Sequence, residues 1–231
     1  MKKHVLLREH TLLVMGLLLF GVGSYLGLAV APPERYMGEV GRILYVHVPT
    51  AWIGLLAFTI GFVFAIFSFR TRELRWDDAL VGLLEVGVVF AAMLLVQGSI
   101  WAKPTWGVFW TWDPRLTTSA IMLVSFLGVL AMRAFVKDPP RRARWTAVGT
   151  IIAFIDVPIV YFSIKWWRTL HQPFSSPETV ASSMVWPLRI NAVALLCIAA
   201  WLVIRRAQLA RRRRAAFETA APEPSHLVAG D

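Results

Sequence analysis

Residues 79–100 read ALVGLLEVGVVFAAMLLVQGSI, 22 positions with one charged side chain, Glu85. A helix rises about 1.5 Å per residue, so a run of this length crosses the ~30 Å hydrocarbon core of a bilayer. A helix on the surface of a soluble protein would carry a continuous polar face, which this run lacks. We therefore interpret the segment as a membrane-spanning helix.

Five more apolar runs of similar length occur in the chain, at residues 11–31, 49–69, 116–136, 145–164 and 186–204. The chain has 231 residues, of which 57% are hydrophobic and 16% charged. An ordinary soluble domain carries about 25% charged residues, so the composition excludes that class. The sequence predicts an all-α integral membrane protein with six transmembrane helices and no separate soluble domain.

Basic residues are unevenly distributed over the segments between these runs. The N-terminus, the loops at 70–78 and 133–144 and the C-terminal tail hold 17 of the 24 Lys and Arg residues. The positive-inside rule places such segments in the cytoplasm. We expect both termini to be cytoplasmic and three loops to be external. The formal net charge of +10 then indicates contact with membrane lipids and not with nucleic acid.

The chain divides by composition into two parts. Residues 1–205 contain the six runs and form the predicted membrane domain, whereas residues 206–231 are rich in arginine and end in a polar segment. We expect the second part to be a basic, disordered cytoplasmic tail, and a stop-transfer anchor with a disordered end is favoured over a segment that lies on anionic lipid or meets a cytoplasmic partner. The lone cysteine, Cys197, excludes a disulfide framework, and no C-x-x-C-H motif for covalent haem attachment or P-loop for nucleotides is present.

Tryptophans are concentrated in and beside the second and third external loops. Seven of the 11 lie there: Trp101, Trp106, Trp110, Trp112, Trp166, Trp167 and Trp186. An interfacial aromatic belt explains isolated members of this set, but not the density of residues 106–113, WGVFWTWD. Trp106 and Trp110 share a face if this segment is helical, and Trp110 and Trp112 share one if it is extended. Either arrangement forms a broad aromatic shelf suited to a large, flat, apolar ligand.

Asp113 and Pro114 follow this shelf. Aspartate is a favoured N-cap, and proline is favoured at the first helical position after it. We expect the carboxylate of Asp113 to cap the fourth helix and to fix the shelf against it.

Two of the five histidines lie in external loops. His47 precedes the second run within YVHVP, and His171 follows the fifth within WWRTLHQP, so both lie at a similar membrane depth. Two imidazoles that face each other across a flat macrocycle are axial ligands of haem iron. Two histidines supply too few donors for a zinc site, and no H-E-x-x-H spacing is present. Haem is favoured over zinc, and hydrogen-bonded interfacial histidines remain the alternative.

Two acidic residues, Glu85 and Asp156, lie within apolar runs, where a charge is costly. They indicate either a proton or ion pathway or contacts between helices, and the second is favoured because no polar residues connect them. Two prolines predict local geometry: Pro158 is expected to kink the fifth helix, and Pro187 to lie in the first turn of the sixth.

The external segments together resemble one family. In chain order they are YVHVP at 45–49, GSIWAKP at 98–104, WGVFWTWD at 106–113, RLT at 115–117 and YFSIKWWRTLHQ at 161–172. They are similar to the haem exporter protein C family (CcmC) of the cytochrome c maturation system, a short member of the WWD-domain haem-handling superfamily. The likeness runs from residue 1 to 205. Longer members of the superfamily have more membrane spans than this chain can hold.

The resemblance implies a subunit that holds haem b transiently at the outer face of the bacterial inner membrane. It would present the haem to a periplasmic haem chaperone, the E component, for covalent attachment. His47 and His171 would be the axial ligands. The WWD motif in the second external loop, about residues 101–115, would supply the platform: Trp101, Trp106, Gly107, Trp110, Trp112 and Asp113.

The resemblance further implies a complex with an ATP-binding subunit, a second membrane subunit and a small single-span subunit. ATP hydrolysis and the covalent chemistry would then belong to partners, so we expect no enzymatic activity from this chain alone. Charge alone suggests Arg115, Arg168 and Lys103 as partners of the haem propionates. Two other functions stay open: a haem or small-molecule permease lined by Glu85 and Asp156, and a structural subunit that binds no ligand.

Overall fold

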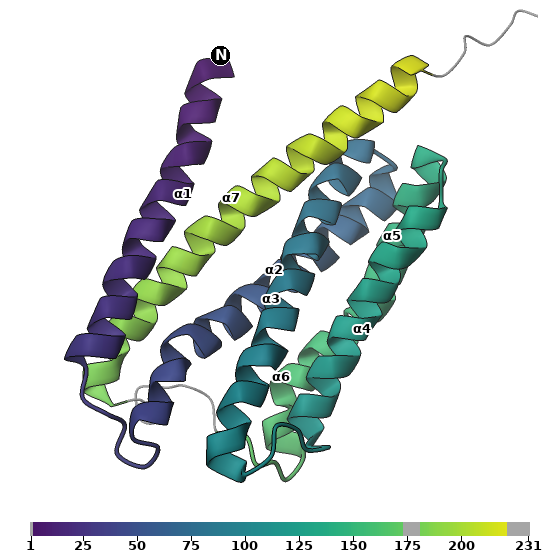
Figure 1. The fold of residues 1–231 in the computed structure, drawn as a ribbon. Helices are drawn as coiled ribbons and strands as arrows, with labels where there is room; N and C mark the ends of the chain where they lie inside the picture. The colour runs from purple at the N-terminus through teal and green to yellow at the C-terminus, as the bar shows by residue number, and fades with distance from the viewer. Residues whose placement is uncertain (1, 173–180, 221–231) are drawn as a thin grey trace, which may run out of the picture.

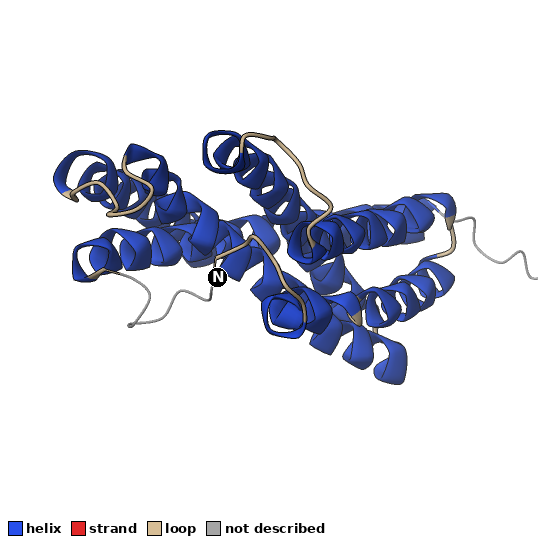
Figure 2. Cartoon of the chain, turned by 90° about the horizontal axis from the view of Figure 1, so that it is seen from below, coloured by secondary structure: helices blue, strands red, loops and turns tan. Residues whose placement is uncertain are grey.

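The chain folds as a bundle of long helices (Figure 1). A computed structural model describes residues 2–172 and 181–220, and within these residues every helix or strand element is a helix (Figure 2). The helices are α1 (Lys2–Tyr25) with a π-helical continuation, η1 (Leu26–Val30); η2, a short 3-10 helix (Glu39–Ile43); α2 (Leu44–Thr71); α3 (Leu74–Trp106); α4 (Pro114–Phe135); α5 (Pro139–Ala153); α6 (Asp156–Trp166); and α7 (Ser182–Ala220).

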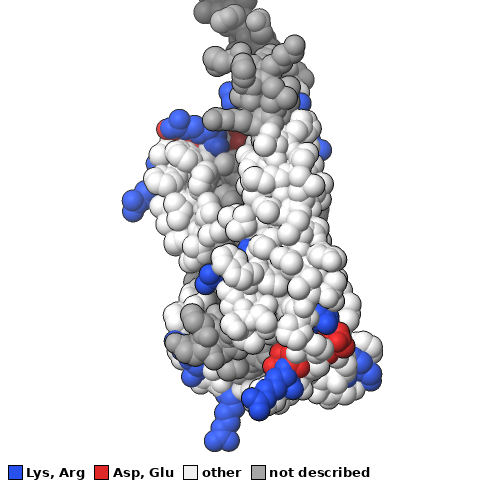
Figure 3. Space-filling model, turned by 90° about the vertical axis from the view of Figure 1, so that its left-hand side faces the viewer, with Lys and Arg blue, Asp and Glu red and all other residues white. Residues whose placement is uncertain are grey.

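Six helical segments of this bundle are long and apolar enough to cross a membrane. They correspond in order to the six predicted runs, with α5 and α6 together forming the fifth, so the all-α, six-span prediction is confirmed. Charged side chains are concentrated toward the two ends of the face shown in Figure 3, with a mostly uncharged band between them. The side of the membrane on which each end lies stays a prediction.

Helix α3 is the centre of the bundle. It packs against α2, α4 and α7, and α2 packs in turn against α5 and α7. Helix α1 lies along α7 at one edge, and α4, α5 and α6 lie at the opposite edge (Figure 1). The start of α1 and the end of α7 lie at the same end of the molecule, as an even number of spans requires (Figure 1).

The fifth span is broken between α5 and α6. Pro158 has no N–H group to donate to the carbonyl of residue 154, four positions earlier. The helix ends at Ala153, and the carbonyl of Phe154 accepts from the N–H of Val157 at 3.0 Å instead. The kink predicted from Pro158 is confirmed, and it takes the form of a tight turn at residues 154–155.

The C-terminal segment differs from the sequence-based expectation in two ways. Pro187 lies inside α7, in its second turn and not its first, because the helix already begins at Ser182. The expectation of a disordered tail from residue 206 is wrong for residues 206–220, which continue α7 to Ala220. Residues 221–231 lie outside the described residues. Alanine, arginine, glutamine and leucine dominate this segment, and all have high helix propensity.

Ion pairs also fix this extension to the bundle. Arg206 of α7 pairs with Glu85 of α3, with one contact of 2.7 Å. Glu85 therefore makes a contact between helices, as favoured from the sequence. Asp156, at the start of α6, is half-buried, and its Oδ2 has no hydrogen-bond partner among the described residues.

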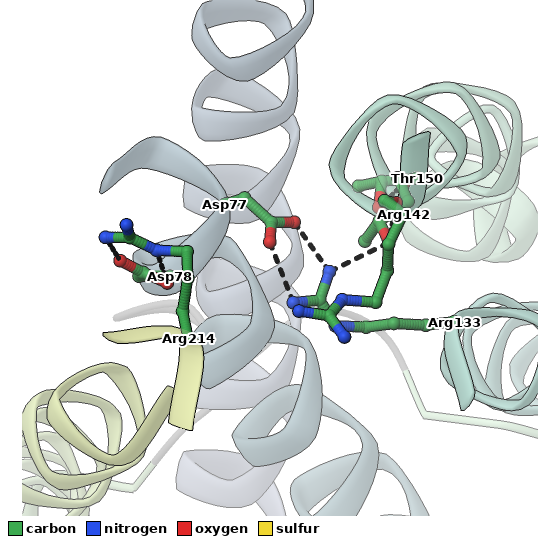
Figure 4. Close-up of polar contacts among 7 residues, drawn as sticks. Asp77, Asp78, Arg133, Arg142, Thr150 and Arg214 are labelled. Atoms are coloured by element: carbon green, nitrogen blue, oxygen red, sulfur yellow. Dashed lines mark hydrogen bonds and ion pairs between the residues drawn. The ribbon is translucent and has the colours of Figure 1, made fainter. Parts of the chain in front are cut away.

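Two consecutive aspartates near the start of α3 join it to two other helices (Figure 4). Asp77 accepts two hydrogen bonds from Arg133 of α4, at 2.6 and 2.7 Å. Asp78 accepts from Arg214 of α7 at 2.8 and 3.3 Å, and the two carboxylates point to opposite sides of α3. Both aspartates are buried, so these pairs set the positions of α4 and α7 relative to α3.

Replacement of Asp77 by asparagine is expected to destabilise the protein strongly. The Arg133 guanidinium would stay buried without its anion, which costs about 3–5 kcal/mol, or roughly 10 °C in the midpoint of thermal unfolding. Thermal unfolding in detergent measures this, with Glu73→Gln as the control because Glu73 pairs with Arg75 at an exposed position. Equal melting temperatures for the two variants would contradict the assignment of a structural role to the buried pair.

Candidate ligand-binding site

A cavity opens between α2, α3, α4 and α6 near the end of the molecule that carries residues 107–113 and residues 167–172. We call the second of these segments, Trp167–Gln172, the His171 loop. The space free of protein atoms is about 1110 Å³, part of it open to the surroundings. Its aromatic wall consists of Trp52, Trp101, Trp106, Trp110 and Tyr161.

His47 and His171 meet in this cavity. Their ring centres are 6.5 Å apart and their planes are inclined by 33°. Two imidazoles joined directly by a hydrogen bond would have centres roughly 5 Å apart. The observed gap therefore leaves room for an atom between the rings. The two histidines therefore lie at one depth, as expected, and their role as a facing pair of ligands stays a prediction.

The position of His47 depends on a proline two residues after it. Helix α2 begins at Leu44, so His47 lies in its first turn and not before it. Pro49 has no N–H to donate to the carbonyl of Tyr45. The Asn191 side chain of α7 donates to this carbonyl at 2.9 Å, and both Asn191 and Tyr45 are buried. An amide from another helix thus completes the backbone hydrogen bonding beside His47.

The segment that leads into α2 is held by the end of the first span. The Arg42 guanidinium donates to the carbonyls of Gly27 and Ala31, at 2.6 and 2.9 Å. A cation at the carbonyl end of a helix is favoured by the helix dipole. Gly27 also lies against the ring of Tyr45, where a Cβ would approach the ring to 2.5 Å, so only glycine permits this packing.

The His171 loop is held by Asp113. As predicted, Asp113 is the N-cap of α4, and its Oδ1 accepts from the Arg115 N–H at 2.9 Å. Its carboxylate also accepts from the Thr169 hydroxyl and from the Leu170 N–H, each at 2.7 Å. Asp113 is buried behind the cavity wall and does not line it.

The imidazole of His171 is oriented by its neighbour. Its Nδ1 lies 2.9 Å from the carbonyl oxygen of Gln172. A carbonyl only accepts hydrogen bonds, so Nδ1 carries the proton and Nε2 keeps its lone pair in the neutral ring. Burial lowers the pKa of His171 below its ordinary value of 6.5, and the Arg115 guanidinium lowers the pKa further. A neutral imidazole with a free Nε2 is the form that ligates metals.

The predicted aromatic shelf is only partly on the cavity wall. Helix α3 ends at Trp106, so residues 107–113 are not helical and the extended alternative applies. Trp110 and Trp112 lie edge to face, with ring centres 6.0 Å apart. Trp101, Trp106 and Trp110 line the cavity, whereas Trp112 is 83% exposed and lies outside it. Gly107 is also off the wall; it ends α3 in the left-handed conformation, with φ of 79°.

The three cations expected near a ligand are placed differently. Arg115 lines the cavity, where its guanidinium donates to the carbonyl of Val160 at 3.0 Å. Lys103 is exposed and donates to the Gly107 carbonyl at 2.9 Å, and Arg168 is exposed on the His171 loop. Neither Lys103 nor Arg168 lines the cavity, so the structure brings neither of them together with Arg115 on its wall.

Three polar atoms of cavity-lining residues are buried without a hydrogen-bond partner in the part of the chain that the structure describes. They are Nδ1 of His47, Oγ1 of Thr50 and Nε1 of Trp101. An unpaired buried polar group costs about 1–3 kcal/mol. Such groups in one cavity indicate a ligand that completes their bonding. No group of three or more His, Cys, Asp or Glu residues within 2–172 and 181–220 is arranged to hold a metal.

Comparison with known proteins assigns the chain to a family. The family model described as heme exporter protein C (CcmC) matches residues 4–220. The chain belongs to the haem exporter protein C family. The match covers all six spans, the histidine pair and residues 106–113, so it includes every part of the cavity.

Relatives of known name support the same assignment. Heme exporter protein C of Bradyrhizobium diazoefficiens is 35% identical over 202 residues, which cover 85% of this chain and 76% of the relative. Heme exporter protein C of Escherichia coli K12 is 31% identical over 200 residues, 84% of this chain and 80% of the relative. A putative cytochrome c biosynthesis ccmC-like mitochondrial protein of Marchantia polymorpha is 35% identical over 173 residues, 74% of this chain and 73% of the relative.

Three wall residues of this member of the haem exporter protein C family were not predicted from the sequence: Trp52, Tyr161 and Gln172. Trp52 lies in an apolar run, where tryptophan is read as part of the membrane-facing surface. Its spacing from His47, five residues along α2, gives no signal, because positions on one face of a helix recur every three or four residues. Gln172 directly follows His171, and its side chain donates to the sulfur of Met37 at 3.0 Å.

Neutrality of His171 is testable in the ligand-free protein. Because burial favours the uncharged ring, protonation of His171 requires a pH below 6.5, and uptake of that proton by the unfolded chain destabilises the fold in acid. Nuclear magnetic resonance of ¹⁵N-labelled histidine in detergent should therefore show His171 neutral at pH 6.5, with Nδ1 protonated. Assignment comes from the His171→Ala spectrum. A ring half protonated at pH 6.5 would contradict the burial described above.

Proposed function

We propose that this chain binds haem between His47 and His171 and holds it for use in cytochrome c maturation. Membership of the haem exporter protein C family implies haem handling, and the plant mitochondrial relative is named for cytochrome c biosynthesis. The observation that supports the ligand assignment best is the pair of imidazoles whose ring centres lie 6.5 Å apart in the cavity.

The residues present fit a haem iron. A bond from a metal to an imidazole nitrogen is about 2 Å long, and the ring centre lies about 1.1 Å beyond that nitrogen. Two axial imidazoles on one iron thus have centres roughly 6 Å apart, close to the 6.5 Å found here. A porphyrin supplies the four equatorial donors that the chain lacks. The aromatic wall supplies an apolar surface for its faces and edges.

The chain's own residues bind and orient, and they do not carry out the chemistry. Bound haem b would supply the iron and the peripheral groups that take part in covalent attachment. His47 and His171 would fix the plane of the ring, and Arg115 would neutralise a carboxylate of the ligand. The tryptophans would exclude water. We therefore infer that the chain has no enzymatic activity alone.

The surface beside the cavity suits delivery to a soluble partner. Trp112 and Phe109 are 83% and 58% exposed, next to the wall residue Trp110. Exposed aromatic side chains of this kind are enriched at protein interfaces. We propose that this surface receives the periplasmic haem chaperone, the E component, and that residues 106–113 act as the WWD platform.

The proposed orientation places the arginine-rich end of α7 in the cytoplasm of a bacterium and the cavity at the outer face of the inner membrane. An ATP-binding subunit, a second membrane subunit and a small single-span subunit would complete an ABC-type complex around this chain. In this arrangement the energy of ATP hydrolysis enters at the end opposite the cavity.

Spectroscopy of the purified chain tests the ligand assignment. Wild type loaded with haem in detergent is expected to show the Soret and visible bands of a low-spin, bis-imidazole species. His47→Ala and His171→Ala should each lose this spectrum and weaken haem binding by at least the roughly 10- to 100-fold that loss of an outer-shell partner causes, because each removes one axial bond. His10→Ala is the matched control, since His10 lies in α1, far along the chain from the cavity. Unchanged spectra and affinity in both cavity variants would defeat the assignment.

The role of Arg115 is tested by a change in the ligand. Haem dimethyl ester has no carboxylates, so wild type should bind it about tenfold more weakly than haem, the value of one charge-assisted hydrogen bond. Arg115→Gln should bind haem and its ester with equal affinity. Arg168→Gln, at an exposed position, should keep the wild-type preference. A preference that persists in Arg115→Gln would exclude Arg115 as the partner.

A further inference from the structure

We propose that Asp113 is a positioning residue whose carboxylate locks the His171 loop, so that the imidazole of His171 faces His47. The inference rests on the proposed function for the identity of the ligand, and on the geometry of the ligand-free chain for the lock itself. Asp113, the aspartate of the WGVFWTWD segment, would then act by positioning His171 and not by contact with the ligand.

The hydrogen bonds of Asp113 connect two parts of the chain that are far apart in sequence. Oδ1 accepts from the Arg115 N–H at the start of α4, and Oδ2 accepts from the Leu170 N–H. The Thr169 hydroxyl lies 2.7 Å from both oxygens. The described hydrogen bonds that tie Thr169 and Leu170 to another helix all end on this carboxylate.

Thr169 extends the lock to the histidine itself. Its hydroxyl donates to Asp113 and accepts from the backbone N–H of His171 at 3.0 Å. The backbone on the N-terminal side of the histidine is thereby fixed, by the N–H groups of Leu170 and His171. The Nδ1 contact with the Gln172 carbonyl then sets the ring orientation.

A second aspartate shows that capping alone does not require this arrangement. Asp138 also precedes a proline and also caps a helix, α5, through the Arg141 N–H at 2.9 Å. Asp138 is exposed, whereas Asp113 is 7% exposed. Burial of a carboxylate is costly unless it is fully hydrogen-bonded. The contacts with Thr169 and Leu170 supply those additional bonds.

A carboxylate is suited to this position because both of its oxygens accept. Asparagine at position 113 would keep one acceptor and present an NH₂ donor in place of the other. That donor would face the N–H of either Arg115 or Leu170, and a donor cannot bond to a donor. We expect Asp113→Asn to keep the local α4 cap through Oδ1, so that its NH₂ group faces Leu170 and the lock is lost with no change in side-chain size.

Hydrogen exchange on the ligand-free chain tests the lock without haem. In Asp113→Asn, exchange of the amides of residues 168–172 is expected to rise about tenfold or more, because the Leu170 and His171 bonds are lost or weakened. Asp138→Asn, the matched cap variant, should leave exchange in this peptide at the wild-type rate. Thr169→Val, which leaves the α4 cap intact, should raise it as Asp113→Asn does, and Thr169→Ser should restore the wild-type rate.

Haem titration gives the second readout. Asp113→Asn and Thr169→Val should weaken haem binding by about 10- to 100-fold, as loss of outer-shell support does at metal sites, with loss of the low-spin spectrum. Thr169→Ser and Asp138→Asn should bind haem as wild type does. If Asp113→Asn does not fold, Thr169→Val decides the question alone.

The two proposals fail in different ways. If wild type binds no haem, the proposed function fails, whereas the exchange rates still decide whether Asp113 fixes the loop. The lock is overturned if Asp113→Asn and Thr169→Val leave exchange of residues 168–172 unchanged. It is also overturned if Asp138→Asn raises that exchange equally, since the effect would then be a general consequence of losing a helix cap.

Discussion

A buried polar group in a membrane-embedded helix bundle needs a partner within the protein, because lipid offers none. At one end of this molecule the requirement is met by bidentate pairs between aspartates of α3 and arginines of α4 and α7. At the other end, a histidine, a threonine and a tryptophan of the cavity wall carry buried polar atoms without a partner. Unpaired buried atoms also occur at the first end, at Nε1 of Trp76 and Nε of Arg142, so it is the gathering of three such atoms around one cavity that points to a ligand there.

Local sequence was sufficient for the features that depend on neighbouring residues. The lengths of the apolar runs predicted the six spans, Asp113 with Pro114 predicted the N-cap of α4, and Pro158 predicted the break in the fifth span. Loop order along the chain also predicted that His47 and His171 share one depth, since alternate loops of a bundle emerge on the same side. Their facing geometry is consistent with that reasoning.

Features set by contacts between distant segments were beyond local sequence. The helical extension of α7 depends partly on Arg214 meeting Asp78, more than a hundred positions earlier, so composition alone suggested disorder. Trp52 reaches the cavity because of how α2 is oriented, while the exposed Trp112 is turned away from it. The bonds of Asp113 to the His171 loop belong to the same class: its capping role was visible in the sequence, and its second set of donors was not.

The hydrogen bond from Asn191 to Tyr45 makes two positions on different helices interdependent. A leucine in place of Asn191 would leave the buried Tyr45 carbonyl without a donor, because Pro49 supplies none. The same leucine would cost less beside an alanine at position 49, whose N–H would donate to that carbonyl within the helix. The effects of the two exchanges on stability are therefore not additive. Epistasis between proline and asparagine is thus built into the helix that carries one of the two histidines.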